Sequence, residues 1–393
     1  MYKIFATLAI LLLSVLIFGS CQSKSEELEK GRIIHVDIEP QEVAVEDLFD
    51  RIEVVPLETT DSALLVFIDR ARVDKNEIFL NDRRTMKVYR FDDKGRFKNT
   101  IGRIGQGPGE YAQAYDFDVD PYSGNVFIIT PYGDVNEYDR NGNYLQSFNP
   151  PSKRYSEINR VDDSHWLTWE GCYIGENAIS VFNNDFTEEV FAPNIPRHMA
   201  NTAYSSPNFF HNGGELYATF SYDRNVYKVT ADSMMIAYTW DFGSENLDEK
   251  SLEKHDINPY EATEEVNMHR TWNFISDTSI KCSLERQSLN SRYNFVVYYY
   301  TVEMDPVTRR GVGPIVFYNV IHDRKTGKSY VFDKLTNGMS ISEFLLMTDD
   351  YMLVMIRPNE LPLYEEYLPE GMKLSDIDPD DDNPVLARFY FKK

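Results

Sequence analysis

Short apolar segments separated by turn residues recur along most of the chain. In the clearest unit the apolar segments are residues 66–73, 77–80, 87–91 and 96–101. Asp, Asn, Lys, Arg and Gly fill the breaks, and Asp, Asn and Gly favour the backbone conformations that tight hairpins need. The pattern returns over residues 116–148, 158–192, 209–242, 272–335 and 344–391. Because four strands in about 40 to 50 residues are typical of a propeller blade, the sequence predicts an all-β, six-bladed β-propeller of four-stranded blades.

Three segments depart from this pattern. Residues 244–268 are rich in Glu, Asp and Lys and poor in β-branched residues, so they predict a short helical insertion that Pro259 interrupts. Residues 361–368 predict another short helix within the last blade. Residues 293–303 fit either a blade strand or an extra hairpin.

A further strand lies outside the repeats, near the N-terminus. Residues 52–57 read Ile-Glu-Val-Val-Pro-Leu, which is typical of a strand. A ring of blades leaves unpaired edges unless its first and last sheets interlock. We therefore expect residues 52–57 to pair within the same sheet as residues 385–391 and to close the ring.

The first twenty residues have the composition of a secretory signal. A single charge, Lys3, precedes the apolar run 4–18, which is too short for a membrane span of about 20 residues. The run ends at Phe18-Gly-Ser-Cys21, which resembles the lipobox of bacterial lipoproteins. We predict a signal peptide over 1–20, a lipid-bearing Cys21, a flexible tether over 21–31 and one propeller domain over 32–393. The alternative is an uncleaved anchor with a buried cysteine.

Charge and cysteine content exclude several classes of partner and fold. The formal net charge is −23, so binding to nucleic acid or to an anionic membrane surface is disfavoured. After Cys21 only Cys172 and Cys282 remain, which excludes a disulfide framework or a cysteine-rich metal site. The two cysteines form either one disulfide or, as we favour, two buried thiols.

The fold expectation is strengthened by a family resemblance. The segment Ile101-Gly-Arg-Ile-Gly-Gln-Gly-Pro-Gly-Glu-Tyr111, followed by residues 116–120 and 124–127, resembles NHL-type repeats. More closely, and with end signatures at 47–59 and 383–386, the chain is similar to six-bladed β-propeller lipoproteins of Bacteroidetes. The resemblance implies the fold over nearly the whole mature chain. It implies no catalytic motif, because that family has no agreed activity.

Motifs for phosphate or calcium binding fail on spacing. Residues 102–109 are glycine-rich but lack the Gly-Lys-Ser/Thr of a Walker loop, and they precede a strand rather than a helix. The acidic clusters at 92–93, 116–120 and 376–382 are interpreted as turns and solvated loops. A calcium loop started at Asp376 would place Asp381 where glycine is required and Ala387 where glutamate is required.

Histidines and aromatic residues give weaker signals. Of seven histidines only His165 and His211 lie near expected inner strands, and neither forms a close metal-binding pair. We therefore predict no metal and no cofactor. Rings that could stack on sugars or peptides are Trp166, Trp169, Tyr173, Trp272 and Tyr298–Tyr300, although core packing is favoured for each of them.

The best candidate for a binding site is the connection over residues 102–115, which is expected to cross one face of the disc toward the channel. Its predicted binding residues are Arg103, Gln106, Glu110, Tyr111 and Tyr115, and the two tyrosines are expected to be accessible. The alternative is that the glycines of this segment only satisfy turn geometry.

The favoured function is a non-enzymatic binding or scaffolding lipoprotein of the outer membrane, on its periplasmic or cell-surface face. Its ligand would be a glycan, a peptide or a partner protein. The alternative is a channel-centred lyase or hydrolase that uses a metal or none. Three or more His, Asp, Glu or Asn side chains converging in the channel would favour the enzyme, and an apolar or Arg/Tyr-lined channel would favour binding.

Overall fold

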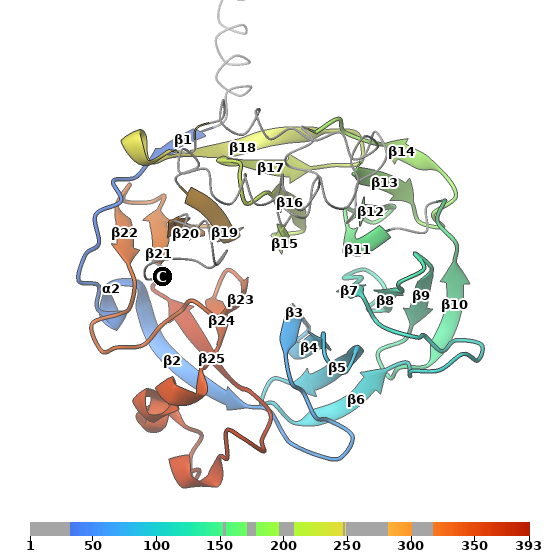
Figure 1. Cartoon of the computed structure of the whole chain (residues 1–393), viewed down its shortest axis with the longest axis horizontal. Coiled ribbons are helices and arrows are strands. Elements are labelled where there is room, and N and C mark those ends of the chain that lie inside the picture. Colours follow the sequence, from blue (N-terminus) through green and yellow to red (C-terminus); the bar gives the residue numbers. More distant parts are fainter. Residues whose placement is uncertain are drawn as a thin grey trace, which may run out of the picture.

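Six β-sheets form a ring (Figure 1), and inner strands line a cavity at its centre, which we call the channel. The computed structural model describes residues 32–151, 155–170, 178–195, 208–246, 248, 282–300 and 317–393. Each sheet is one blade, and its first strand lies beside the channel while its last lies at the rim. The prediction of an all-β, six-bladed propeller with four-stranded blades is confirmed, and one blade carries a fifth strand.

Blades one to six follow one another around the ring in the order of their inner strands. The inner strands are β3 (Ile68–Asp74), β7 (Asp116–Val119), β11 (Tyr155–Arg160), β15 (Asn208–Asn212), β19 (Cys282–Leu289) and β23 (Phe344–Met347). The second strands are β4 (Glu77–Asp82), β8 (Val126–Ile129), β12 (His165–Glu170), β16 (Glu215–Thr219), β20 (Tyr293–Tyr300) and β24 (Tyr351–Met355). The third strands are β5 (Lys87–Asp92), β9 (Val135–Tyr138), β13 (Ile179–Asn183), β17 (Asn225–Val229), β21 (Phe317–Asp323) and β25 (Val385–Phe391). The fourth strands are β6 (Phe97–Ile101), β10 (Tyr144–Phe148), β14 (Glu189–Phe191), β18 (Met234–Asp241), β22 (Ser329–Phe332) and β2 (Phe49–Pro56).

Helical structure is sparse and lies between strands. The described helices are α2 (Val45–Leu48), η1 (Gly243–Glu245), η3 (Pro358–Tyr367) and η4 (Leu374–Asp376). The short helix predicted at 361–368 is confirmed by η3. Most of the insertion predicted over 244–268 lies outside the described residues. β20 resolves the alternative at 293–303, because it is the second strand of blade five. None of the helices among the described residues is long and apolar enough to span a membrane.

Ring closure follows the expected pairing. β2 runs antiparallel to β25 as the outermost strand of blade six, with Ile52 opposite Phe389 and Pro56 opposite Val385. The last blade therefore takes three strands from the C-terminal end of the chain and one from the N-terminal end. This interlock pairs an edge that would otherwise stay open.

An additional N-terminal strand was not predicted. β1 (Arg32–His35) runs parallel to β18 and forms the fifth strand of blade four, where the Ile34 side chain is buried. Residues 36–48, which we call the strap, then pass along blade five. In the strap Gln41 N donates to Val331 O at 2.7 Å, and Val43 O accepts from Thr336 N at 2.9 Å. β1, the strap and β2 together connect blades four, five and six.

The core consists of apolar side chains packed between neighbouring blades. Phe79 of blade one and Ile128 of blade two belong to one such cluster. Between blades two and three, the ring of Phe127 lies 4.3 Å from that of Trp166. Both faces of a blade are covered in this way, which explains why every side chain of the Val126–Ile129 strand is buried.

Candidate functional site

Polar or charged residues two positions apart on three inner strands face one another in the channel wall. β3 carries Arg70 and Arg72, and β7 carries Asp116 and Asp118. β11 adds Glu157 and Asn159, and β15 adds His211. Because side chains alternate between the faces of a strand, positions i and i+2 point the same way. We call these seven residues the channel network.

The first layer of the network joins one arginine to two carboxylates. Arg70 Nη1 donates to Asp116 Oδ2 at 2.7 Å, and Arg70 Nη2 donates to Glu157 Oε2 at 2.5 Å. Asp116 Oδ2 also accepts the backbone N–H of Ile158 at 2.9 Å. One guanidinium thus ties blades one, two and three together.

The second layer lies one pleat further along the same strands. Arg72 Nε donates to Asp118 Oδ1 at 2.6 Å, and Arg72 Nη2 donates to Asn159 Oδ1 at 3.0 Å. Asp118 Oδ2 accepts the backbone N–H of Arg160 at 2.7 Å and lies 3.3 Å from His211 Nε2. This layer extends the contact from blade one as far as blade four.

The pKa values of the two buried aspartates, Asp116 and Asp118, are shifted in opposite directions. Burial raises the pKa of Asp116, and Glu157 adds to this effect because both carboxylates share Arg70. Burial opposes ionisation of Asp118 too, but Arg72, His211 and the Arg160 amide outweigh it and lower the pKa of Asp118. For Arg70, burial disfavours the charge, yet Asp116 and Glu157 raise its pKa.

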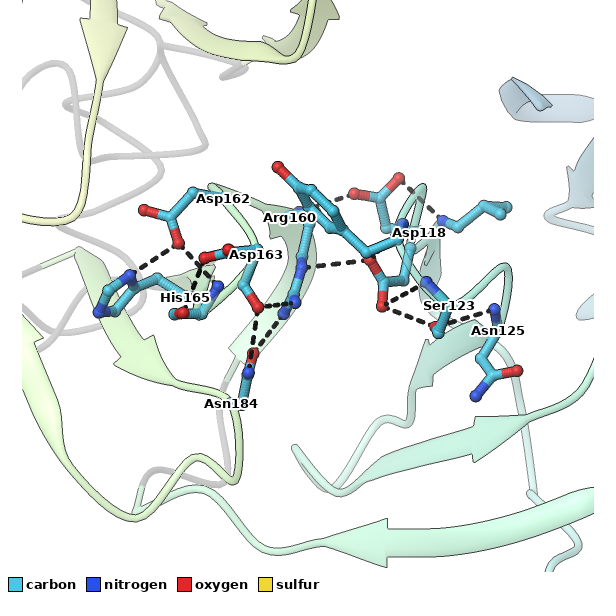
Figure 2. A network of polar contacts seen from close by, with 12 residues as sticks. Asp118, Ser123, Asn125, Arg160, Asp162, Asp163, His165 and Asn184 are labelled. Carbon is cyan, nitrogen blue, oxygen red and sulfur yellow. Dashed lines mark hydrogen bonds and ion pairs between the residues drawn. The ribbon is translucent and has the colours of Figure 1, made fainter. Parts of the chain in front are cut away.

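A third arginine connects blades two and three beyond the end of β7 (Figure 2). Arg160 Nη2 donates to Asp163 O at 2.7 Å, and Nη1 donates to Asn184 Oδ1 at 2.5 Å. Its Nε lies 3.3 Å from Asp120 Oδ1, and its guanidinium carbon lies 4.5 Å from the centre of the Trp166 ring. Figure 2 shows this side chain between the turn of Ser123 and the turn of Asp162 and Asp163. Its role is to join two blades.

Two cavities lie against the channel network. The first, which we call the mouth cavity, has a volume of about 440 Å³ and is lined by residues that include Arg70, Arg83, Gln113, Tyr115, Ser156 and Glu157. The second also has a volume of about 440 Å³ and runs past Arg72, His211, Ser288, Phe344 and Leu346. Both cavities include Asp69, Arg70, Arg83 and Glu157, so they meet at the first layer.

The structure separates the five predicted binding residues. Tyr115 is 45% exposed and lines the mouth cavity. Arg103 and Gln106 are exposed, and neither lines a described cavity. Glu110 turns back into its own loop, where Oε2 accepts Gly107 N at 2.9 Å. The expectation that Tyr111 is accessible is wrong, because it is 2% exposed and its hydroxyl donates to Ile101 O at 2.8 Å.

Two glycines of this loop have a packing role. Gly102 has φ +62, and a Cβ there would lie 2.7 Å from the Tyr138 ring and 2.9 Å from the Tyr111 ring. Gly109 has φ +74, and a Cβ there would lie 2.3 Å from Tyr144. Neither the backbone conformation nor the space accommodates a side chain. For these two positions the turn-geometry alternative explains the glycine.

The two histidines have different surroundings. His211 belongs to the channel network, and its side chain is 30% exposed. His165 Nδ1 lies 2.8 Å from Asp162 Oδ1 within the turn before β12, away from the channel. Trp166 and Trp169 are buried between blades, in agreement with core packing. Tyr173, Trp272 and Cys172 lie outside the described residues, and Cys282 is buried.

The acidic cluster at 116–120 is not a solvated turn. Asp116 and Asp118 are 3% and 1% exposed, and each pairs with an arginine of β3. Asp120 pairs with Arg160. Within the described part of the chain, no three His, Cys, Asp or Glu side chains are grouped closely enough to hold a metal ion. In this cluster the carboxylates are paired with guanidinium groups instead of a cation.

Sequence reasoning missed the arginines and Glu157. A signal was present, since Arg70-Ala-Arg72, Asp116-Phe-Asp118 and Glu157-Ile-Asn159 each place two polar residues on one face of an inner strand. This spacing indicates a shared face on each strand but does not identify the partners, which lie on other blades.

Comparison with known proteins supports the fold. No curated protein matches the chain. A crystal structure of an exported protein of Bacteroides fragilis is similar with a TM-score of 0.72 and 20% identity, covering 92% of this chain and 100% of that one. A member of the DUF4221 family from Bacteroides vulgatus has a TM-score of 0.53 and 9% identity, covering 88% of this chain and 98% of that one.

These likenesses confirm the architecture that the family resemblance implied. The NHL-like repeat and the lipoprotein character stay predictions. The family model described as Domain of unknown function (DUF4934) matches residues 32–390, which run from the first to the last described strand, and the protein therefore belongs to this family.

Proposed function

We propose that the protein is a non-enzymatic binding lipoprotein of the outer membrane and that its ligand occupies the mouth cavity. The observation that carries the proposal is the lining of this cavity. Arg83, Gln113, Tyr115 and Ser156 add a cation, an amide, a ring and a hydroxyl to the paired charges of Arg70 and Glu157. A concave site with a few convergent polar groups and an aromatic ring suits a polar ligand.

The channel network meets the criterion for an enzyme, because Asp118, Asn159 and His211 converge, and it also meets the criterion for binding, because Arg70 and Arg72 line the same wall. The ion pairs of the network favour binding. Each buried carboxylate of the network is bound by a guanidinium. Carboxylates fixed in this way hold the site in one geometry, and such preorganisation lowers the entropic cost of binding.

We propose the outer membrane as the location of the protein. The similar Bacteroides fragilis structure is that of an exported protein. The apolar run before Cys21 supports export and lipid attachment of this chain as well. The ligand class stays a glycan, a peptide or a partner protein.

The test combines a ligand panel with two matched tyrosine variants. We expect Y115A to weaken the binding of the glycan or peptide that the wild type retains, by about tenfold, because stacking contributes roughly 1 kcal/mol or more. Y132A is the control, since Tyr132 is 67% exposed and lines none of the described cavities. Equal binding by wild type and Y115A would place the ligand elsewhere and reject the proposal.

A channel-centred hydrolase or lyase is the second candidate, and one observation favours it. Asp116 retains its proton to higher pH than Asp118, so the two aspartates could divide the roles of acid and base. Incubating each retained ligand with wild type and with D116N distinguishes the candidates. Turnover by the wild type that D116N abolishes would establish the enzyme, while unchanged ligand recovered from both supports binding.

A further inference from the structure

A third cavity lies at the seam between blades six and one, and it shares no lining residue with the two cavities beside the channel network. It has a volume of about 570 Å³ and is formed by the connection from β2 to β3, the end of β24 and the segment that precedes β25. In Figure 1 the blue connection after β2 and the red segment with η3 and η4 border this region. We call it the seam groove.

The seam groove presents large apolar side chains to solvent. Leu64, Val66 and Phe67 are 50%, 65% and 48% exposed. Three such residues within four positions form a cluster, whereas single exposed apolar residues are common and need no explanation. Ile356 and Leu361 continue the apolar lining from below, where they are buried.

Buried polar side chains hold this exposed segment in one conformation. Asn383 Oδ1 accepts from Leu65 N at 2.8 Å, and Asn383 Nδ2 donates to Glu58 O at 2.8 Å and to Ala63 O at 2.6 Å. Asp82 accepts from the backbone N–H groups of Val66 and Phe67. Asn383 is 4% exposed and Asp82 is 0% exposed. The apolar side chains are thus displayed on a fixed backbone, which is what a preformed docking surface needs.

The rim of the groove is acidic. Asp380, Asp381 and Asp382 line it in succession. In the described part of the chain none of the three takes part in an ion pair, and the one nearby arginine, Arg357, is bound to Glu343 at 2.9 Å. Three carboxylates beside an apolar surface are complementary to a ligand that carries both apolar and cationic side chains.

We propose that the seam groove binds an extended segment of a partner protein in which large apolar residues alternate with Lys or Arg. The apolar side chains would cover Leu64, Val66 and Phe67, and the cations would face the three aspartates. The seam groove and the mouth cavity share no lining residue.

The probe for this proposal is a short fluorescein-labelled peptide that alternates leucine and lysine. Its anisotropy is followed with the full mature chain. Two companion peptides carry glutamate in place of lysine or serine in place of leucine. We expect the leucine–lysine peptide to bind and both companions to fail, with affinity that falls as salt is added.

Matched protein variants localise the binding. We expect V66S, and separately D380N/D381N/D382N, to weaken the peptide by about tenfold, since rim charges contribute modestly and the apolar contact is partial. The control E188Q/E189Q/D232N removes the same charge from exposed acids of blades three and four. Melting temperatures verify folding, which V66S should leave unchanged.

Three outcomes would overturn the proposal. An equal loss of affinity in the control triple variant would mean that the acidic surface as a whole attracts the peptide. Full affinity in V66S would mean that the groove is not used. A wild-type dimer in sedimentation velocity that V66S dissociates would show that a second copy of the chain occupies the groove instead.

Discussion

At the scale of single residues, Tyr111 is buried and Arg103 is exposed, although both belong to the same loop. The Tyr111 ring packs edge-on against Tyr138, with ring centres 6.2 Å apart, and fills the gap between blades one and two. The Arg103 side chain is 82% exposed and lies 3.6 Å from Glu110. Tyr111 therefore anchors the loop, whereas the exposed Arg103 side chain contributes little to its packing.

The first prediction follows from this contrast. Y111A should lower the free energy of unfolding by about 3–5 kcal/mol, because it removes a buried ring. Y111F should cost about 1 kcal/mol through the lost hydrogen bond to Ile101 O. R103A should change stability by less than about 0.5 kcal/mol. Urea unfolding measures all three, and equal effects of Y111A and R103A would contradict the packing described here.

The second prediction concerns acid unfolding. Burial alone would raise the pKa of Asp323, but hydrogen bonds from Arg292 and from Lys325 N lower it to about 2. A carboxyl whose pKa is lower in the folded than in the unfolded state stabilises the fold above its unfolded pKa, and it loses that effect as pH falls through the folded value. The contribution of Asp323 should therefore be complete at pH 7 and disappear between about pH 4 and pH 2.

The corresponding variant is D323N. It should reduce stability by about 2 kcal/mol at pH 7 and approach the wild type near pH 2, as measured by urea unfolding across this range. D350N is the matched control, because Asp350 is exposed and joins no ion pair of the described residues. A D323N deficit that persists unchanged at low pH would contradict an electrostatic origin.

In the channel network, the sequence predicts which residues share a strand face but not which residues pair. Residues on one strand could be assigned to one face from their spacing, as with Arg70 and Arg72. Their partners could not, because Arg70 and Asp116 are 46 positions apart and meet only when two blades pack together. In the sequence alone, Asp116 and Asp118 resemble turn residues. In the folded protein they are buried and form ion pairs with Arg70 and Arg72.

At the scale of elements, the N-terminal strands serve different purposes. β2 closes the ring by pairing with β25, whereas β1 adds a fifth strand to a blade that already has four.

The third prediction is that removing residues 22–39 leaves a folded protein with a lower melting temperature. Removing residues 22–58 should abolish the cooperative transition, because the outer edge of β25 then loses its partner. Calorimetry distinguishes the two truncations, and similar melting of the longer truncation and the intact chain would show another mode of closure.

The elements also differ in how far they could be predicted. The strands of blade one agree with the sequence to within two residues, because each hairpin is local and its turn residues mark its ends. β2 could be assigned because a propeller requires closure. β1 could not, since it has only four residues and pairs in parallel with a strand about 200 positions later. No local pattern indicates such a pairing.

At the scale of the whole molecule, the lipid predicted on Cys21 would fix where the propeller resides. The fourth prediction is that Cys21 is the first residue of the mature protein and carries the lipid. Intact-mass analysis of membrane-extracted protein should give the acylated chain from Cys21, and C21A should release the protein from the membrane fraction. A soluble mature form cleaved at another residue would rule out this assignment.

The path of β1, the strap and β2 imposes an order on folding. These residues precede all the other described strands in the chain, yet β1 pairs only with β18 and β2 pairs only with β25, the last described strand. Contacts between such distant positions form slowly, because the entropic cost of closing a long loop comes before the contacts stabilise the chain. A chain made only as far as β24 therefore has an unpaired β2 and an open ring, so the native circle closes only once β25 has formed.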